Sequence, residues 1–143
     1  MKSNFDIALS FVFQWEGYKS NDPQDSGGKT IFGISSKAHP KDVTKMWDLP
    51  KEEAKQIASE IYKNDYWNAM ELDDMESKKD IFLFDTAVNM GTGYARKIED
   101  LELNDMILAR IKRYNEISAR DNLKFLRGWL SRVLVLVELL KTI

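Results

Sequence analysis

The feature that most constrains the fold is a spacing of apolar residues at every third or fourth position, which recurs in separate segments of the chain. This spacing places apolar side chains on one face of a helix. We predict helices over residues 3–16, 50–67, 77–90, 103–120 and 125–141. Segments containing glycine or proline separate them, and these residues end one helix before the next begins. The sequence therefore predicts a mainly α protein.

The first helix is followed by a segment of a different kind. Ser3 or Asn4 can cap this helix and Gly17 can end it. The next residues contain the turn signals "NDP" and "SGG", and then "TIFGI", whose β-branched and aromatic residues favour a strand. We therefore predict a small β-hairpin near residues 18–34. Its return should bury Ile31 or Phe32 against the first helix.

Composition excludes several classes of protein. The length of 143 residues suits a single compact unit, and the net charge of -2 argues against nucleic acid as a partner. The chain has no cysteine, which excludes disulfides, thiol catalysis and cysteine metal sites. It has one histidine, His39, so no second histidine can complete a metal site. We expect no cofactor and a monomer.

The chain has no obvious membrane or secretion signal. Its run "VLVLV" stops at Glu138 and is far shorter than the ~20 residues that span a bilayer. The N-terminus lacks the features of a signal peptide. We expect synthesis in the cytoplasm and no membrane insertion.

Residues 110–132 carry seven basic side chains against Glu116 and Asp121. A solvated helix face is one interpretation of this pattern. The other is a surface that meets an anionic polymer.

The stretch "FQWEGYKSNDPQDSGGKTIFGIS" contains the candidate chemistry. Glu16 ends an apolar helix between Phe13 and Trp15. Apolar surroundings and a helix C-terminus both favour the protonated form of a carboxyl group, and a protonated carboxyl can deliver a proton to a leaving oxygen. The alternative interpretation is a solvated helix end.

A second carboxylate would come from the loop that follows. Asp22 and Asp25 lie on this loop, and the Thr30 hydroxyl beside two acids could position a water molecule. Both aspartates can instead be simple turn residues. A calcium loop fits poorly, because Gly33 falls where the bidentate acid of such a loop belongs.

The segment "WEGYKSNDPQDSGGKTIFGIS" resembles the signature of glycoside hydrolase family 108, whose bacterial and phage N-acetylmuramidases carry E-G-G-Y followed by N-D-P, G-G, T and F-G-I. "IYKNDYW", "FDTAVNMG" and "GWLSRV" are similar to further blocks of that family, in the same order. The resemblance covers nearly the whole chain, although only Gly17 stands where the family has two glycines. It implies a lysozyme-like helical fold with a small β-hairpin beside the catalytic glutamate. It also implies hydrolysis of the β-1,4 bond between N-acetylmuramic acid and N-acetylglucosamine in peptidoglycan.

The resemblance assigns the general acid to Glu16. The order acid, aspartate, threonine also resembles phage-type lysozymes and nominates Asp25 as base or charge stabiliser, with Asp22 in reserve, and Thr30 as the residue that orients water. Two carboxylates suffice for glycoside hydrolysis without a cofactor. We expect Asp25 across a cleft from Glu16, at the wider spacing typical of inverting enzymes.

Substrate contacts are expected from Tyr18, Asp22, Phe32, Tyr66, Trp67, Asp85 and Asn89. Trp67 could equally be a core residue. Asp85 and Asn89 are one helical turn apart on an apolar face, so they either form a satisfied buried network or edge the cleft. Trp129 is expected to pack between the last two helices.

The resemblance divides the chain into a muramidase region, residues 1–76, and a helical region, residues 77–143, that resembles a shortened peptidoglycan-binding domain. We expect both to form one unit joined through Leu126, Trp129, Leu130 and Val133.

The expected partner is the glycan strand of peptidoglycan, with a holin or an export system giving access to the wall. A phage lysin, a prophage relic and a secretion-associated muramidase all remain open. The alternatives are a catalytically weak peptidoglycan-binding or structural protein of the same fold, and a chitin-directed glycosidase.

Overall fold

The computed structural model describes residues 3–22, 28–119 and 123–143, and it is mainly α as predicted. The α-helices are α1 (Asn4–Glu16), α2 (Pro40–Trp47), α3 (Lys51–Tyr62), α4 (Lys79–Met90), α5 (Thr92–Ile98), α6 (Leu103–Ile117) and α7 (Leu123–Lys141). A π-helical turn, η1 (Lys63–Asn68), continues α3, and a 3-10 turn, η2 (Leu72–Asp74), precedes α4. The strands are β1 (Lys19–Ser20), β2 (Thr30–Ile31) and β3 (Ile34–Ser35). None of the described helices is long and apolar enough to cross a membrane.

Helix α1 begins and ends where the sequence predicts. Ser3 and Asp6 form a capping box, in which the Ser3 hydroxyl accepts a hydrogen bond from the Asp6 backbone. Gly17 ends the helix with a φ of 70°, a value that glycine adopts without steric cost. The buried residues of α1 are Ala8, Leu9, Phe11 and Val12.

The prediction of one strand over "TIFGI" is wrong, because the chain reverses inside it. β1, β2 and β3 form an antiparallel sheet in that order, with a tight turn at Phe32 and Gly33 between β2 and β3. Phe32 has a φ of 50° and Gly33 a φ of 82°, and these left-handed conformations turn the backbone. The predicted burial is confirmed, since Ile31 and Phe32 are buried and the Phe32 ring lies 5.4 Å from that of Phe13 in α1.

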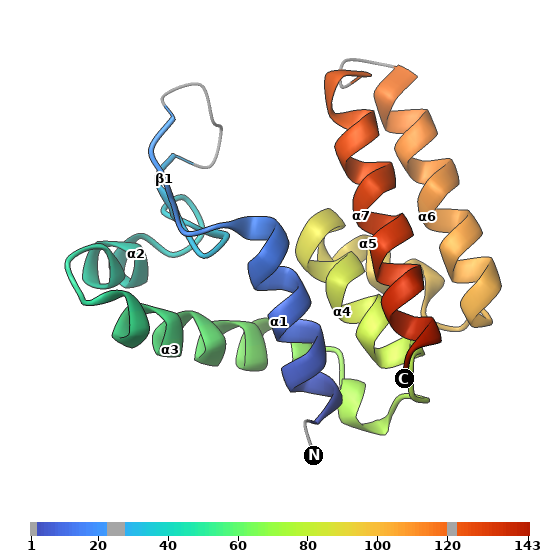
Figure 1. Cartoon of the computed structure of the whole chain (residues 1–143), viewed down its shortest axis with the longest axis horizontal. Helices are drawn as coiled ribbons and strands as arrows, with labels where there is room; N and C mark the ends of the chain where they lie inside the picture. The colour runs from blue at the N-terminus through green and yellow to red at the C-terminus, as the bar shows by residue number, and fades with distance from the viewer. Residues whose placement is uncertain (1–2, 23–27, 120–122) are drawn as a thin grey trace.

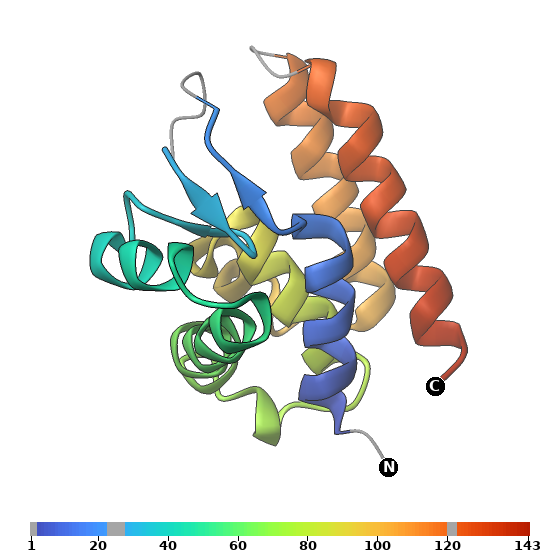
Figure 2. The same ribbon diagram turned by 60° about the vertical axis from the view of Figure 1, so that its left-hand side comes forward.

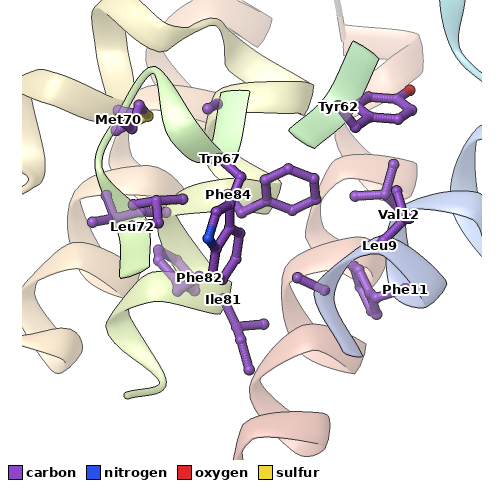
Figure 3. Packing of buried hydrophobic residues seen from close by; sticks show 14 of the residues in the cluster. Leu9, Phe11, Val12, Tyr62, Trp67, Met70, Leu72, Ile81, Phe82 and Phe84 are labelled. Carbon is purple, nitrogen blue, oxygen red and sulfur yellow. The ribbon is translucent and has the colours of Figure 1, made fainter. Parts of the chain in front are cut away.

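Helix α1 runs through the middle of the molecule. Figure 1 and Figure 2 show the sheet, α2 and α3 on one side of it and α4 to α7 on the other, with α6 and α7 side by side and antiparallel. The core joins the two sides (Figure 3): Leu9 and Val12 of α1 pack in one cluster with Tyr62 of α3, Trp67 of η1 and Phe84 of α4. The sheet is thereby held at the C-terminal end of α1, where Glu16 lies.

Helix α7 is rotated relative to the prediction. Its buried residues are Arg132, Val133, Leu136 and Leu140, whereas Leu130 is 38% exposed. Leu126, Leu130 and Leu134 line a shallow hollow on the outer side of the helix. The predicted contact through Leu130 is therefore wrong, because α7 turns its Arg132, Val133 and Leu136 side inward instead. Trp129 stacks on Tyr114 of α6, as expected for packing between the last two helices, but its ring contacts with Tyr114 and Phe125 lie within the helical region and do not join it to residues 1–76.

Candidate active site

Glu16, the last residue of α1, is bound by an arginine from the other end of the chain. Arg132 Nη1 of α7 donates a hydrogen bond of 2.7 Å to Glu16 Oε1. The Glu16 side chain remains 25% exposed, so it is partly accessible to solvent. The turn before β3 covers its aliphatic part, since a Cβ atom on Gly33 would lie 2.8 Å from Glu16 Cγ.

The surroundings of Glu16 differ from the apolar walls that the sequence suggests. Phe13 packs against Phe32 and Tyr62, while Trp15 is 36% exposed and packs against Phe11. The closest partner of the carboxylate is instead the Arg132 guanidinium. The site is therefore a charged one.

Arg132 is fixed by a second carboxylate, that of Asp85 on α4. Its Nη2 donates to Asp85 Oδ1 at 2.7 Å, and its Nε donates to both carboxylate oxygens of Asp85 at 3.1 and 3.3 Å. Burial by itself would lower the pKa of Arg132, but the charges of Asp85 and Glu16 raise it above its ordinary value. Arg132 therefore carries its positive charge at any physiological pH.

Behind Asp85 the network continues to α6. Arg110 Nη2 donates to Asp85 Oδ2 at 2.7 Å, and the same guanidinium donates to Thr86 Oγ1 at 3.0 Å and to the Tyr114 hydroxyl at 2.9 Å. The Tyr114 hydroxyl in turn donates a short hydrogen bond to Asn89 Oδ1. Asp85 is 1% exposed. Of the two interpretations of Asp85 and Asn89, the buried and satisfied network is the one that the structure shows for Asp85.

Two tyrosines lie within electrostatic range of Glu16. Burial raises the pKa of Tyr62 well above its ordinary value, and the charge of Glu16 raises it further. The pKa of Tyr66 is raised by burial, then by the charges of Asp65 and Glu16. Both hydroxyls therefore stay protonated, and that of Tyr62 donates to the Phe32 carbonyl at 2.7 Å. The Tyr66 side chain is half-buried.

Two of the predicted substrate contacts are core residues. Trp67 is 1% exposed and its indole nitrogen donates to Asp73 at 2.8 Å. Phe32 is 4% exposed. Neither ring can stack on a sugar, so these two assignments are corrected, and Asp85 is excluded by the same degree of burial. Tyr18 is half-buried, and its ring lies 5.0 Å from that of Phe32.

The loop that carries the candidate second carboxylate is described only at its ends. Thr30 is half-buried on β2, paired with Ser20 and Ser35. Asp22 is exposed just after β1. Asp25 lies outside the described residues, so its predicted position across from Glu16 stays a prediction.

Asn89 lines a hollow of about 330 Å³ among α4, α5, α6 and α7. Tyr94, Arg113, Phe125 and Trp129 also line it. Trp129 lies between the rings of Tyr114, at 5.1 Å, and Phe125, at 5.9 Å.

A larger hollow of about 660 Å³ lies between α1 and α3, and its lining residues, which include Ser10 and Glu52, do not include Glu16. Within the described ranges, no three histidine or acidic side chains are grouped to hold a metal ion.

Reasoning from the sequence missed Arg110 and Arg132. For these two residues the solvated-face interpretation of segment 110–132 is wrong, since they are 0% and 5% exposed. The available signal was their position on the apolar face: Arg110 is four residues after Met106 and four before Tyr114, and Arg132 is four before Leu136. A charged residue on such a face requires a buried partner of opposite charge.

Comparisons with known proteins agree with this architecture. The family description "Glycosyl hydrolase 108" matches residues 9–91, a segment that includes Glu16 and Asp85. The structure of Brucella abortus SagA superposes with a TM-score of 0.70 at 24% sequence identity, over 96% of this chain and 94% of that one, and so shares the fold. No curated protein sequence gives a significant match. Since the family match spans more than half of the sequence, this chain belongs to glycosyl hydrolase family 108 and is a glycoside hydrolase.

Proposed function

We propose that the protein is an N-acetylmuramidase that hydrolyses the β-1,4 bond between N-acetylmuramic acid and N-acetylglucosamine, with Glu16 as the general acid. Family membership supports peptidoglycan as the substrate. The observation that carries the assignment is the contrast between the two carboxylates that bind Arg132. Glu16 is 25% exposed and Asp85 is 1% exposed, so only Glu16 can reach a glycosidic oxygen.

In this mechanism Glu16 protonates the leaving oxygen of the scissile bond. A second carboxylate, for which we propose Asp25 with Asp22 in reserve, activates water or stabilises the positive charge that develops on the sugar ring. Thr30 orients the water molecule. We favour inversion, which requires carboxyl groups roughly 6.5–9.5 Å apart to admit the water, and no step requires a cofactor.

The substrate contacts that we propose are Tyr18, Asp22, Tyr66 and Asn89. Each of these side chains is exposed or half-buried, unlike those of Trp67, Phe32 and Asp85. Tyr66 is supported further by its electrostatic proximity to Glu16. Aromatic rings with one accessible face suit the C–H faces of sugars.

We further propose that residues 1–76 and 77–143 act together as one monomeric unit on the cell wall. Access to the wall would depend on a holin or an export system. Action as a phage or prophage endolysin and action in secretion both fit this activity.

The assignment of the acid is tested by Glu16→Gln. Glutamine can still accept the hydrogen bond from Arg132 but cannot donate a proton as an acid, so clearance of a peptidoglycan suspension should fall about 100-fold or more. The melting temperature should fall only modestly: one positive charge is left uncompensated on Arg132, but glutamine keeps the hydrogen bond and the side chain is partly exposed. The matched control is Glu53→Gln on α3, an exposed glutamate that should keep full activity. A Glu16→Gln variant with a tenth or more of the wild-type rate would exclude Glu16 as the acid.

The same assay separates the remaining alternatives. Asp25→Asn should lose activity strongly, and a larger loss in Asp22→Asn would move the second carboxylate to Asp22. Mass analysis of the released muropeptides identifies the bond cleaved, and NMR of the first product identifies its anomeric configuration. Cleavage of chitin oligomers without cleavage of peptidoglycan would favour the chitin-directed alternative. A protein that binds the wall without cleaving it would be the catalytically weak alternative.

A further inference from the structure

Four charged groups, one of them the candidate acid, form a single network, and their charges balance only when all four are ionised. Glu16 and Asp85 are the two carboxylates, and Arg110 and Arg132 are the two guanidinium groups, joined in a continuous series of ion pairs. With Glu16 ionised, two negative charges meet two positive charges. With Glu16 protonated, as a general acid must be, one positive charge remains uncompensated beside it. The protonation of Glu16 is therefore coupled to the charge of Arg132.

The geometry shows which end of Arg132 is anchored. Its Nε and Nη2 atoms donate hydrogen bonds to Asp85, and only Nη1 donates to Glu16. Arg110 holds Asp85 from the other side at 2.7 Å. The guanidinium thus keeps its position through Asp85 when Glu16 gains or loses a proton. A fixed positive charge next to Glu16 is the result.

We propose that Arg132 is a positioning residue for Glu16, which orients its carboxyl group and keeps a fixed positive charge beside it. The proposal rests on the proposed role of Glu16. Arg132 lies 116 residues away from Glu16 in sequence, so the acid receives its partner only when α7 has docked against α1.

The other groups around Glu16 leave Arg132 as its charged partner among the described residues. Tyr62 of α3 and Tyr66 of η1 lie within electrostatic range, and both are neutral because their pKa values are raised. Asp85 of α4 and Arg110 of α6 lie behind Arg132 and bind each other. An adjacent positive charge favours the ionised form of a carboxyl group. Removing the charge of Arg132 should therefore shift Glu16 toward the protonated form.

The test reads the titration of Glu16 directly, without depending on enzyme activity. The Cδ resonance of Glu16 is followed against pH by NMR in protein labelled with ¹³C-glutamate, and Glu16→Gln gives its assignment. In Arg132→Gln the titration midpoint should rise by about one pH unit, a roughly tenfold increase in proton affinity. Arg132→Lys, which keeps the charge, should stay closer to the wild type. Arg132→Met, with an unbranched neutral side chain, serves as a second neutral variant if the glutamine variant does not fold.

The matched control is Arg127→Gln, which removes an exposed arginine from the same helix and should leave the midpoint unchanged. Hydrolysis by the neutral Arg132 variants should show a lower kcat with a nearly unchanged KM. The alkaline limb of the activity profile should move to higher pH by the same amount as the midpoint, and Arg132→Lys should restore part of kcat.

A folded neutral variant whose Glu16 titrates as in the wild type would overturn the proposal, even if it had lost activity. An effect of equal size in Arg127→Gln would overturn it too. If Glu16→Gln keeps its activity while the midpoint shifts as expected, the role of Glu16 as the acid is wrong and the coupling to Arg132 stands. The two failures are thereby distinguished.

Discussion

At the scale of single residues, Gly33 determines how closely the sheet approaches the candidate acid. A Cβ atom at this position would lie 2.5 Å from the Tyr62 hydroxyl oxygen and 2.9 Å from Glu16 Cβ. The backbone φ of 82° is also in the region that side-chain-bearing residues rarely adopt. Steric fit and backbone conformation both require glycine, which explains why the turn inside "TIFGI" occurs at this residue.

Replacing Gly33 by alanine should therefore affect both stability and activity. The unfavourable φ alone costs about 1–3 kcal/mol, and the close contacts of the added Cβ atom with Glu16 and Tyr62 should displace the Glu16 side chain as well. We expect a melting temperature lower by several degrees and a loss of wall hydrolysis. Gly128→Ala is the control: it lies within α7 with nothing near the added methyl group, and should stabilise by about 0.5–1 kcal/mol. Equal melting temperatures for the Gly33→Ala variant and the wild type would contradict this explanation.

At the scale of elements, α7 has two apolar faces, and the sequence does not say which one faces inward. Leu136 is 0% exposed, whereas Leu134 on the same helix is 61% exposed. The spacing of leucine and valine along α7 fits several rotations of the helix about its axis. The ion pairs of Arg132 with Glu16 and Asp85 are compatible with the inward rotation that the structure shows.

Two leucine-to-alanine substitutions compare these faces. Leu136→Ala should lower the free energy of unfolding by about 2–5 kcal/mol, because it leaves a cavity in the core. Leu134→Ala should change it by no more than about 0.5 kcal/mol. Chemical denaturation of both variants measures the difference. Equal losses would mean that α7 is rotated from the position described, or that a partner covers Leu134 in solution.

At the scale of the whole molecule, the two halves share one core. Helix α1 packs in the same cluster with residues of α3, η1 and α4, and with Leu136 and Leu140 of α7. Arg132 adds ion pairs from α7 to both α1 and α4. Neither the residues before position 77 nor those after it bury their apolar surfaces alone. Independent folding of residues 1–76 and 77–143 is therefore not expected.

We predict one cooperative unfolding transition in calorimetry, with equal calorimetric and van't Hoff enthalpies. Leu136→Ala should shift this transition as a whole, because the side chain lies in the shared core. Two separate transitions, with only one of them moved by the substitution, would show instead that the halves are independent domains.

The sequence by itself determined five of the helices, α1, α3, α4, α6 and α7, the position of Glu16 at the end of the first one, and the family, but it did not predict α5. Hydrophobic spacing and the glycine and proline breaks are local signals, and the family motifs are contiguous in sequence. The Ser3 cap and the Gly17 end of α1 are therefore where they were predicted.

Only the tertiary structure decided the surroundings of Glu16. The Arg132 partner lies 116 residues away in sequence, and no local pattern states that the two side chains will meet. Burial of Trp67, Phe32 and Asp85 was likewise decided by packing, since a residue on an apolar face can lie in the core or edge a cleft. Ion pairs and burial depend on which helices become neighbours, and that follows from the whole set of packing contacts together.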